Sequence, residues 1–291
     1  MDMSLQVGMK TLAMASVIMA AGLTASGVAL PAATYADNHM QKMTVEADNE
    51  LEWRRDDQQY IARGNAVITT KDMVFNASII TAHYDNSANT GNNRITLIIG
   101  DGKAEVVRLN EQGNEDISGM ADRITYDRAS DIMTLSRQKN SSDNDMIRVT
   151  RGDDISEADE SIVYDRNKGI ITSTGNSITT LADGRRMHGD QAVTTLKDDG
   201  STIDTIIVTG QVMIIQPMAE GGTQQATGQK AVYDAALDIV TVTGDVVLTQ
   251  QENVIKGGTA VMRIGEGQSV VTSDENTGRV SGQFFIEDNN N

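Results

Sequence analysis

The sequence contains no cysteine, only two prolines and few aromatic residues. Without cysteine, disulfide scaffolds and thiolate-based metal or redox sites are excluded. Phe, Trp and Tyr make up 3% of the chain, which is too few for a platform that stacks bases or sugars. Positive charge is also scarce, because 24 Lys and Arg stand against 41 Asp and Glu, a formal net charge of −17. Such a chain repels phosphate backbones, so we expect no nucleic acid among its partners.

Motifs of known enzymes are missing as well. The sequence has no nucleophile elbow, zinc-protease helix motif, phosphate-cradling loop or dinucleotide fingerprint. Its histidines, His39, His83 and His188, lie far apart. Acidic clusters at 143–145 and 153–160 lack the glycine and terminal glutamate spacing of a calcium loop. We therefore expect no catalytic residue, no metal site and no cofactor.

An apolar run over residues 11–36 follows Lys10 and ends in small residues. Thr34 and Ala36 occupy the −3 and −1 positions of a cleavage site. This pattern predicts that residues 1–36 are a signal peptide, cleaved after Ala36, and that the protein is exported to the periplasm. The alternative is a retained membrane anchor, since the run is long enough to span a bilayer.

From Met43 onward, short segments rich in Val, Ile and Thr alternate with Gly, Asn and Asp, as in DIVTVTGDVVLTQ at 238–250. Helical periodicity is absent. Pro217 is the single proline of this region, which fits backbones that need their N–H groups for strand ladders. The sequence therefore predicts an all-β fold.

Two marks recur along this region. Tyr-Asp ends a predicted strand, and Gly followed by a polar residue begins one; the tyrosines are Tyr84, Tyr126, Tyr164 and Tyr233, and the glycines are Gly64, Gly175, Gly210 and Gly244. A longer period of 111 residues separates Gly64 from Gly175, and 107 residues separate Tyr126 from Tyr233. The chain is thus predicted to be a tandem duplication, with units at 43–160 and 161–287 and a disordered tail at 288–291.

The two units differ at one point and have no linker between them. The first copy has Ser136-Arg137 where the second has Thr243-Gly244, so we expect a different turn there. No Pro- or Ser-rich stretch marks the boundary near residue 160. A missing linker favours one continuous strand stack over two separate domains.

The string AVYDAALDIVTVTGDVVLTQQENVIKGGTAVM at 231–262 resembles the signature stretch of the OstA-like proteins, the LptA family of periplasmic lipopolysaccharide-transport proteins. IIGDGKAEVVRLNEQGNEDISGMADRITYD at 98–127 is similar to the preceding part of the same domain, as are MTVEADNELEW and YIARGNAVIT near residue 43. The chain departs from the family in length, since it holds two such units where one is usual. The resemblance implies a V-shaped β-jellyroll of antiparallel strands whose interior accepts lipid acyl chains.

Strict alternation places aliphatic side chains on one face around three of the four recurring glycines. The predicted lipid-contact residues on this face are Ala66, Ile68, Ile206, Val208, Val212, Ile214, Val240, Val242, Val246 and Leu248. Around Gly175 the same positions include Ser173, Ser177 and Thr179, a polar patch. A closed core remains the alternative, but the near absence of aromatic bulk predicts an underfilled interior and hence a groove.

The resemblance also implies partners. These are lipopolysaccharide and other OstA-like domains, LptC-like at the inner membrane and LptD-like at the outer membrane, joined by pairing of end strands. Residues 43–53 and 278–287 are the candidate docking strands, and they equally allow head-to-tail self-association. The alternative role for Phe284 and Phe285 is to plug the final layer. The chain is thus predicted to be a non-enzymatic, lipopolysaccharide-binding component of the transport bridge.

Other functions are kept open by the sequence. One alternative is an LptC-like, membrane-anchored transport subunit. Another is a structural or adhesin β-solenoid without lipid transport. A β-helix polysaccharide lyase is disfavoured, because the sequence offers no aromatic, basic cleft.

Overall fold

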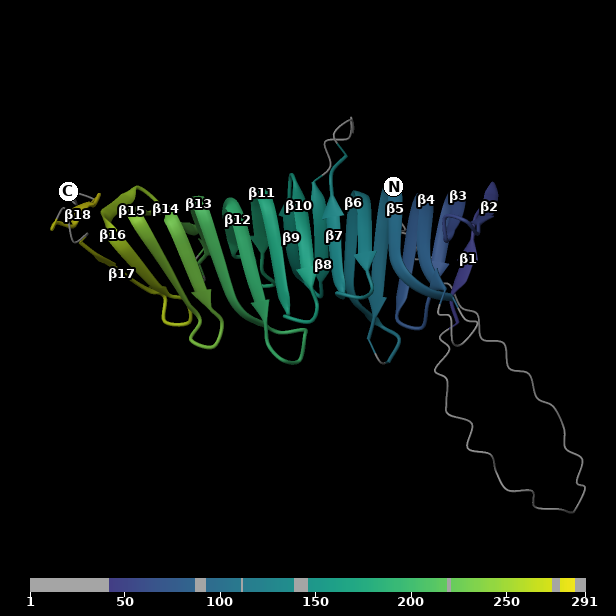
Figure 1. Cartoon of the computed structure of the whole chain (residues 1–291). Helices are drawn as coiled ribbons and strands as arrows, with labels where there is room; N and C mark the ends of the chain where they lie inside the picture. The colour runs from purple at the N-terminus through teal and green to yellow at the C-terminus, as the bar shows by residue number, and fades with distance from the viewer. Residues whose placement is uncertain are drawn as a thin grey trace, which may run out of the picture. The chain divides into compact units, whose positions relative to one another are not determined.

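The computed structural model describes residues 42–86, 93–110, 112–138, 146–218, 221–273 and 278–285. Every regular element in these ranges is a β-strand, and paired strands run antiparallel (Figure 1). The predicted all-β, antiparallel fold is confirmed. The predicted signal peptide and C-terminal tail lie outside the described residues. Across the described ranges, no helix has the length and apolar character needed to cross a membrane.

The strands follow one another along the chain with short connections. Their bounds are β1 Thr44–Glu46, β2 Glu50–Arg54, β3 Gln59–Thr69, β4 Met73–Asn86, β5 Asn93–Leu109, β6 Glu115–Asp127, β7 Ile132–Ser136, β8 Ile147–Arg151, β9 Asp154–Ala158, β10 Ser161–Asp165, β11 Ile170–Thr180, β12 Arg186–Leu196, β13 Ile203–Pro217, β14 Thr223–Asp234, β15 Ile239–Gln250, β16 Asn253–Arg263, β17 Gln268–Thr272 and β18 Ser281–Gln283.

The recurring glycines lie inside strands and do not begin them, which corrects the sequence-based expectation. In β3, Gly64 and Asn65 have φ of 86° and 42° and together oppose Ser78 of β4. Two residues against one is a β-bulge, which bends the strand without ending it. Glycine suits the first position because it has no Cβ to clash at positive φ. Equivalent bulges begin at Gly102, Gly175, Gly210 and Gly244.

The bulges divide the strands into two half-sheets. Each long strand contributes one segment to each half-sheet, on either side of its bulge. Half-sheet 1 contains β2, β7, β10, β17 and the segments that pair with them directly or through neighbouring long strands. Half-sheet 2 contains β1, β8, β9, β18 and the segments on the other side of the bulges. Residues from both half-sheets, such as Ala62 from the first and Ile68 from the second, share one core cluster. The core therefore lies between the two half-sheets.

The Tyr-Asp pairs close the strand ends as predicted, and their hydrogen bonds explain why. Asp127 accepts hydrogen bonds from the backbone N–H groups of Ser130 and Ala129, which fixes the turn after β6. These backbone hydrogen bonds lower the pKa of the Asp127 carboxyl. Tyr126 donates its hydroxyl to Asp131 at 2.8 Å across the same turn. The turn after β14 repeats the pattern with Asp234 and its neighbours.

Strand pairing continues across residue 160, as the missing linker indicated. β6 is flanked by two short strands, β7 on half-sheet 1 and β8 on half-sheet 2. β7 pairs with β10, and β8 pairs with β9. The predicted departure at Ser136-Arg137 is therefore a strand end, where β7 stops and no bulge carries the chain into half-sheet 2. Figure 1 shows this split layer between the long strands β6 and β11.

Candidate functional site

The predicted lipid-contact residues all lie in the space between the half-sheets, and none is more than 4% exposed. The strand register sets them side by side. Val208 of β13 opposes Ala231 of β14, which opposes Val242 of β15, which opposes Ala260 of β16. The aliphatic face thus runs from strand to strand through the second repeat.

The interior is packed by its own side chains. Gly228 lies where a Cβ would approach Val242 Cγ1 to 2.6 Å, so the glycine leaves room for the valine. Alternation of large and small residues across facing strands is what close packing requires. The aliphatic face is therefore a filled core.

Aromatic side chains contribute to this filling, contrary to the sequence-based expectation of an underfilled interior. Phe75 is 0% exposed, and Tyr84, Tyr164 and Tyr233 are 4%, 5% and 8% exposed. Each of these rings occupies more volume than an aliphatic side chain. The expectation was wrong because the total number of aromatic residues is low while a large share of them points inward.

The polar patch near Gly175 is buried, as the alternation predicted. Ser173, Ser177 and Thr179 are at most 3% exposed. The Ser177 hydroxyl donates a hydrogen bond to the backbone carbonyl of Gly189 at 3.2 Å. The second repeat therefore begins with small hydroxyl side chains inside the core, and the aliphatic rows resume at β13.

On the side opposite the bulges, the turns of the two half-sheets come together along a line that we call the seam. Arg185, in the turn between β11 and β12, crosses the seam in the second repeat. Its side chain is 5% exposed, and its Nη1 lies 3.0 Å from Oδ1 of Asp238, in the opposite turn. Its guanidinium also lies 4.7 Å from the centre of the Tyr233 ring. These contacts hold the half-sheets together over the second core.

Charge and burial oppose each other at this crossing. Burial raises the pKa of the Asp183 carboxyl, but the hydrogen bonds and charge of Arg185 outweigh it, and the net pKa lies below the ordinary value. Burial raises the pKa of Tyr233. Arg185 thus keeps its neighbouring carboxylate ionised at the edge of an apolar core.

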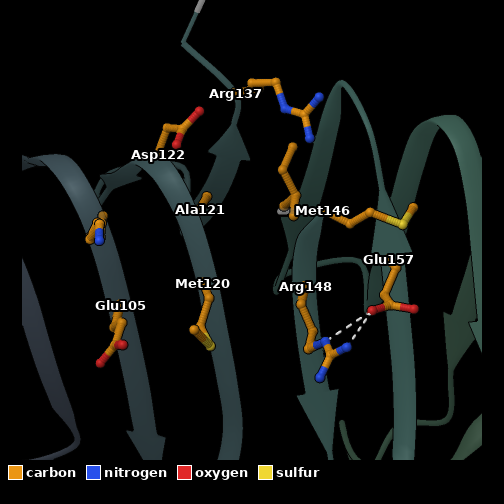
Figure 2. Close-up of a pocket in the computed structure, with 11 residues that line it drawn as sticks. Glu105, Met120, Ala121, Asp122, Arg137, Met146, Arg148 and Glu157 are labelled. Carbon is orange, nitrogen blue, oxygen red and sulfur yellow. Dashed lines mark hydrogen bonds and ion pairs between the residues drawn. The ribbon is translucent and has the colours of Figure 1, made fainter. Parts of the chain in front are cut away.

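A cavity of about 640 Å³ lies on the outer side of the split layer (Figure 2). Met120 of β6 and Arg148 of β8 line it, and Arg148 forms a 2.6 Å ion pair with Glu157 of β9. Half of the Arg148 side chain is exposed. An exposed ion pair contributes little binding energy, so we assign no ligand to this cavity.

The first and last layers expose large apolar side chains. At the first end, Leu51 and Trp53 of β2 are 59% and 51% exposed. At the last end, Phe284 and Phe285 are 62% and 58% exposed, so neither ring plugs the final layer. The predicted docking segment 278–287 contains β18, whereas β17, which forms the other half of the final layer, was missed.

The histidines stand apart, as they do in the sequence. His83 lies 3.5 Å from Gln59 through its Nδ1, and burial lowers the pKa of His188, aided by the charge of Arg186. Among the described residues, no group of three His, Asp or Glu is arranged to hold a metal ion. His39 and the acidic cluster 143–145 lie outside the described residues.

Sequence reasoning missed Phe75, Arg108 and Arg185, which all point inward. Phe75 lies in MVFNASII, where the face is signalled only by alternation with Met73 and Ala77. Arg108 continues the inward alternation of Ala104 and Val106, a signal that was available but whose charge argued against burial. No local signal marks Arg185, because its partner Asp238 is distant in sequence.

Comparison with known proteins gives a match to a family and a likeness to solved structures. The chain matches the family described as "LptA/(LptD N-terminal domain) LPS transport protein" twice, at residues 44–160 and 156–268. The predicted tandem duplication is thereby confirmed. A search of the curated proteins found no match. The structure is similar to the crystal structure of LptH, the LptA homologous periplasmic component of the conserved lipopolysaccharide transport device from Pseudomonas aeruginosa, with a TM-score of 0.41 and 13% identity over 46% of this chain and 95% of that one.

Proposed function

This chain belongs to the LptA/LptD N-terminal domain family of lipopolysaccharide transport proteins, and on that premise we propose that it is a periplasmic, lipopolysaccharide-binding component of the transport bridge. Acyl chains lie between the two half-sheets, and the saccharide stays outside. The chain acts as a carrier without catalysing a reaction, and directional movement comes from its partners.

The observation that carries this proposal is the aliphatic interior. Its inward rows, such as Val208, Ala231 and Val242, cross successive strands with similar chemistry at each one. Burial of an acyl chain gains about 0.8 kcal/mol per methylene removed from water. Because the affinity for an acyl chain is similar at each strand, a lipid moves from one strand to the next without being held much more tightly at any of them.

Lipid entry requires the half-sheets to part at the seam. The inward side chains fill the interior, so an acyl chain must replace contacts that they make with each other. The contacts across the seam are side-chain contacts, whereas strand ladders hold each half-sheet together. Opening the seam therefore costs far less than separating neighbouring strands.

Photo-crosslinking distinguishes the interior from the outer face. A photoreactive amino acid at Val246, which is 1% exposed and points inward, is expected to capture lipopolysaccharide in cells. The same residue at Val247, on the opposite face of the strand, is expected to capture none, because successive side chains of a strand alternate. Capture at neither position in a folded, exported protein would contradict the carrier function and favour a structural β-solenoid.

The junction between the repeats provides a template for docking with partners. β10 and β9 pair with β11 in the same way as β2 and β1 pair with β3. On the other side of the junction, β7 and β8 pair with β6 in the same way as β17 and β18 pair with β16. The internal β7–β10 and β8–β9 pairs therefore predict how the last layer of one molecule pairs with the first layer of the next.

Burial at the junction supports this docking. Ile162 and Tyr164 of β10, the counterparts of Leu51 and Trp53, are 0% and 5% exposed where β7 covers them. Exposed Leu51 and Trp53 gain the same cover when a strand from another molecule is added. The partners are LptC-like and LptD-like domains of the same family, or a second copy of this chain.

Transfer of the junction register predicts specific contacts. Leu135 pairs with Ile162 at the junction, so Val271 should pair with Leu51 of the next copy. We expect a Leu51→Cys protein mixed with a Val271→Cys protein to form an intermolecular disulfide, since opposed residues lie about 4.5–5.5 Å apart. The chain has no cysteine of its own. Val270→Cys, which points to the other face, is the control. Equal yields from both mixtures would contradict the register, and no disulfide from either would exclude self-association.

A further inference from the structure

A cavity of about 50 Å³ lies at the seam of the first repeat, where three arginines meet in a chain of net charge −17. Arg108 reaches it from half-sheet 2, and Arg128 and Arg166 reach it from turns of half-sheet 1. Asp72, Met73 and Tyr126 are among its other lining residues. Three arginines and one aspartate therefore line one entrance to an apolar core.

Arg108, whose side chain is 24% exposed, has one buried donor without a hydrogen-bond partner. Its Nε is buried without a hydrogen-bond partner among the described residues. The nearest ion-pair contact that it makes is 3.7 Å, from Nη1 to Oδ2 of Asp116, which is too long for a hydrogen bond. Such a donor is open to a hydrogen bond with water or with a ligand.

Arg151 repeats this situation close by. It is the last residue of β8, on the same inward face as Val149. Its Nη1 is also buried without a hydrogen-bond partner, and Asp154 lies 3.5 Å away. Two inward-facing guanidinium groups in one half-sheet therefore carry unused donors.

A second cavity of about 20 Å³ adjoins the first, since Arg108 and Met133 line both. Its other walls are mostly aliphatic core residues, including Val106 and Leu135. Guanidinium groups at the entrance and hydrocarbon further in suit a ligand with an anionic head and an acyl tail. Arg pairs with phosphate through two parallel hydrogen bonds, which is the strongest such contact available to a side chain.

The second repeat lacks this arrangement. Register places Gln216 at the position of Arg108, because Ile215 opposes Arg186 as Val107 opposes Val74. Its seam arginine, Arg185, already contacts Asp183 and Asp238. The first repeat therefore differs in the three arginines that line this cavity, of which Arg166 is paired with Asp131 at 3.0 Å.

We propose that the seam of the first repeat is a binding site for the phosphate group of an amphiphile, with Arg108 as its principal donor and Arg128 and Arg166 beside it. The inference rests on the proposed function, because the acyl tail must enter the same interior. The phosphate binds at the seam and the first methylenes of the chain lie against Met133. The overall negative charge then sets a general repulsion that this site overcomes locally.

The test uses Arg108→Gln, which installs the residue of the second repeat. Binding of bis-phosphorylated lipid A, of its enzymatically dephosphorylated form and of inorganic phosphate is measured on the purified protein by equilibrium titration. We expect R108Q to bind the phosphorylated lipid about tenfold more weakly, with unchanged binding of the dephosphorylated lipid. R108K, which keeps the charge, should recover part of the loss. R123Q, which removes an arginine paired with Asp101 away from the seam, is the matched control and should bind both lipids as wild type does.

The outcomes separate this site from the proposed function. Equal affinity of R108Q and wild type for the phosphorylated lipid overturns the site but leaves the carrier function. Failure of the wild type to bind either lipid overturns the carrier function itself. Inorganic phosphate that binds as tightly as the phosphorylated lipid overturns the assignment to a lipid headgroup. Thermal unfolding of R108Q is expected close to the wild-type temperature, because Arg108 is 24% exposed and its ion pair with Asp116 is long.

Discussion

Phe75→Ala is expected to lower the free energy of unfolding by about 3–5 kcal/mol, the range for loss of a fully buried aromatic ring. Phe75 is 0% exposed and lies in the core of the first repeat. Urea unfolding followed by the fluorescence of Trp53, the single tryptophan, reports on this repeat, because the Trp53 indole donates a hydrogen bond to Tyr84 at 2.9 Å.

Phe284→Ala is the control for this prediction. It removes the same side chain from a site that is 62% exposed, so stability should change by no more than about 0.5 kcal/mol. Similar losses from the two variants would mean that Phe75 is not a core residue.

Gly100 explains how the ring is accommodated. A Cβ at Gly100 would overlap the Phe75 ring. The Gly100→Ala substitution should therefore lower the free energy of unfolding more when it is made in the wild type than when it is made in the Phe75→Ala variant. A double-mutant cycle measures this coupling.

Covalent closure of the seam is expected to abolish lipid loading. Arg185→Cys and Asp238→Cys replace a pair that spans the two half-sheets, and a short, cleavable bismaleimide then joins the thiols. The native chain has no cysteine, so only these positions react. Because acyl chains enter between the half-sheets, capture of lipopolysaccharide by a photoreactive residue at Val246 should fall at least about tenfold, which corresponds to about 1.4 kcal/mol.

The same protein provides its own control. The unlinked double variant should capture lipopolysaccharide at Val246, and cleavage of the linker should restore capture to that level. Undiminished capture in the linked protein would show that lipid reaches the interior by another route, such as the open ends of the stack.

Much of the fold could be predicted from local patterns. Alternation of Val240, Val242, Val246 and Leu248 correctly predicted one buried face, because side chains alternate sides in any strand and the Gly244 bulge preserves that face. The Tyr-Asp pairs marked strand ends, since the aspartate hydrogen-bonds to its own turn. The recurring glycines were assigned to strand starts, because glycine at positive φ serves turns and bulges alike.

Contacts across the interior could not be predicted in this way. Whether the aliphatic face is an open groove or a filled core depends on how closely the second half-sheet approaches, which is not encoded in the alternation of a single strand. Phe75 meets Gly100 and Arg185 meets Asp238, which lie far away in sequence, and β17 is recognisable as a docking strand only beside β16.

The sequence by itself determined the strand class, the repeat, the buried face and the family resemblance, because each rests on periodicity or on short local motifs. The tertiary structure alone decided that the interior is filled, that the turns meet at a seam, and that three arginines line one cavity there. Those features depend on pairs of residues from different half-sheets, and only folding brings such pairs together.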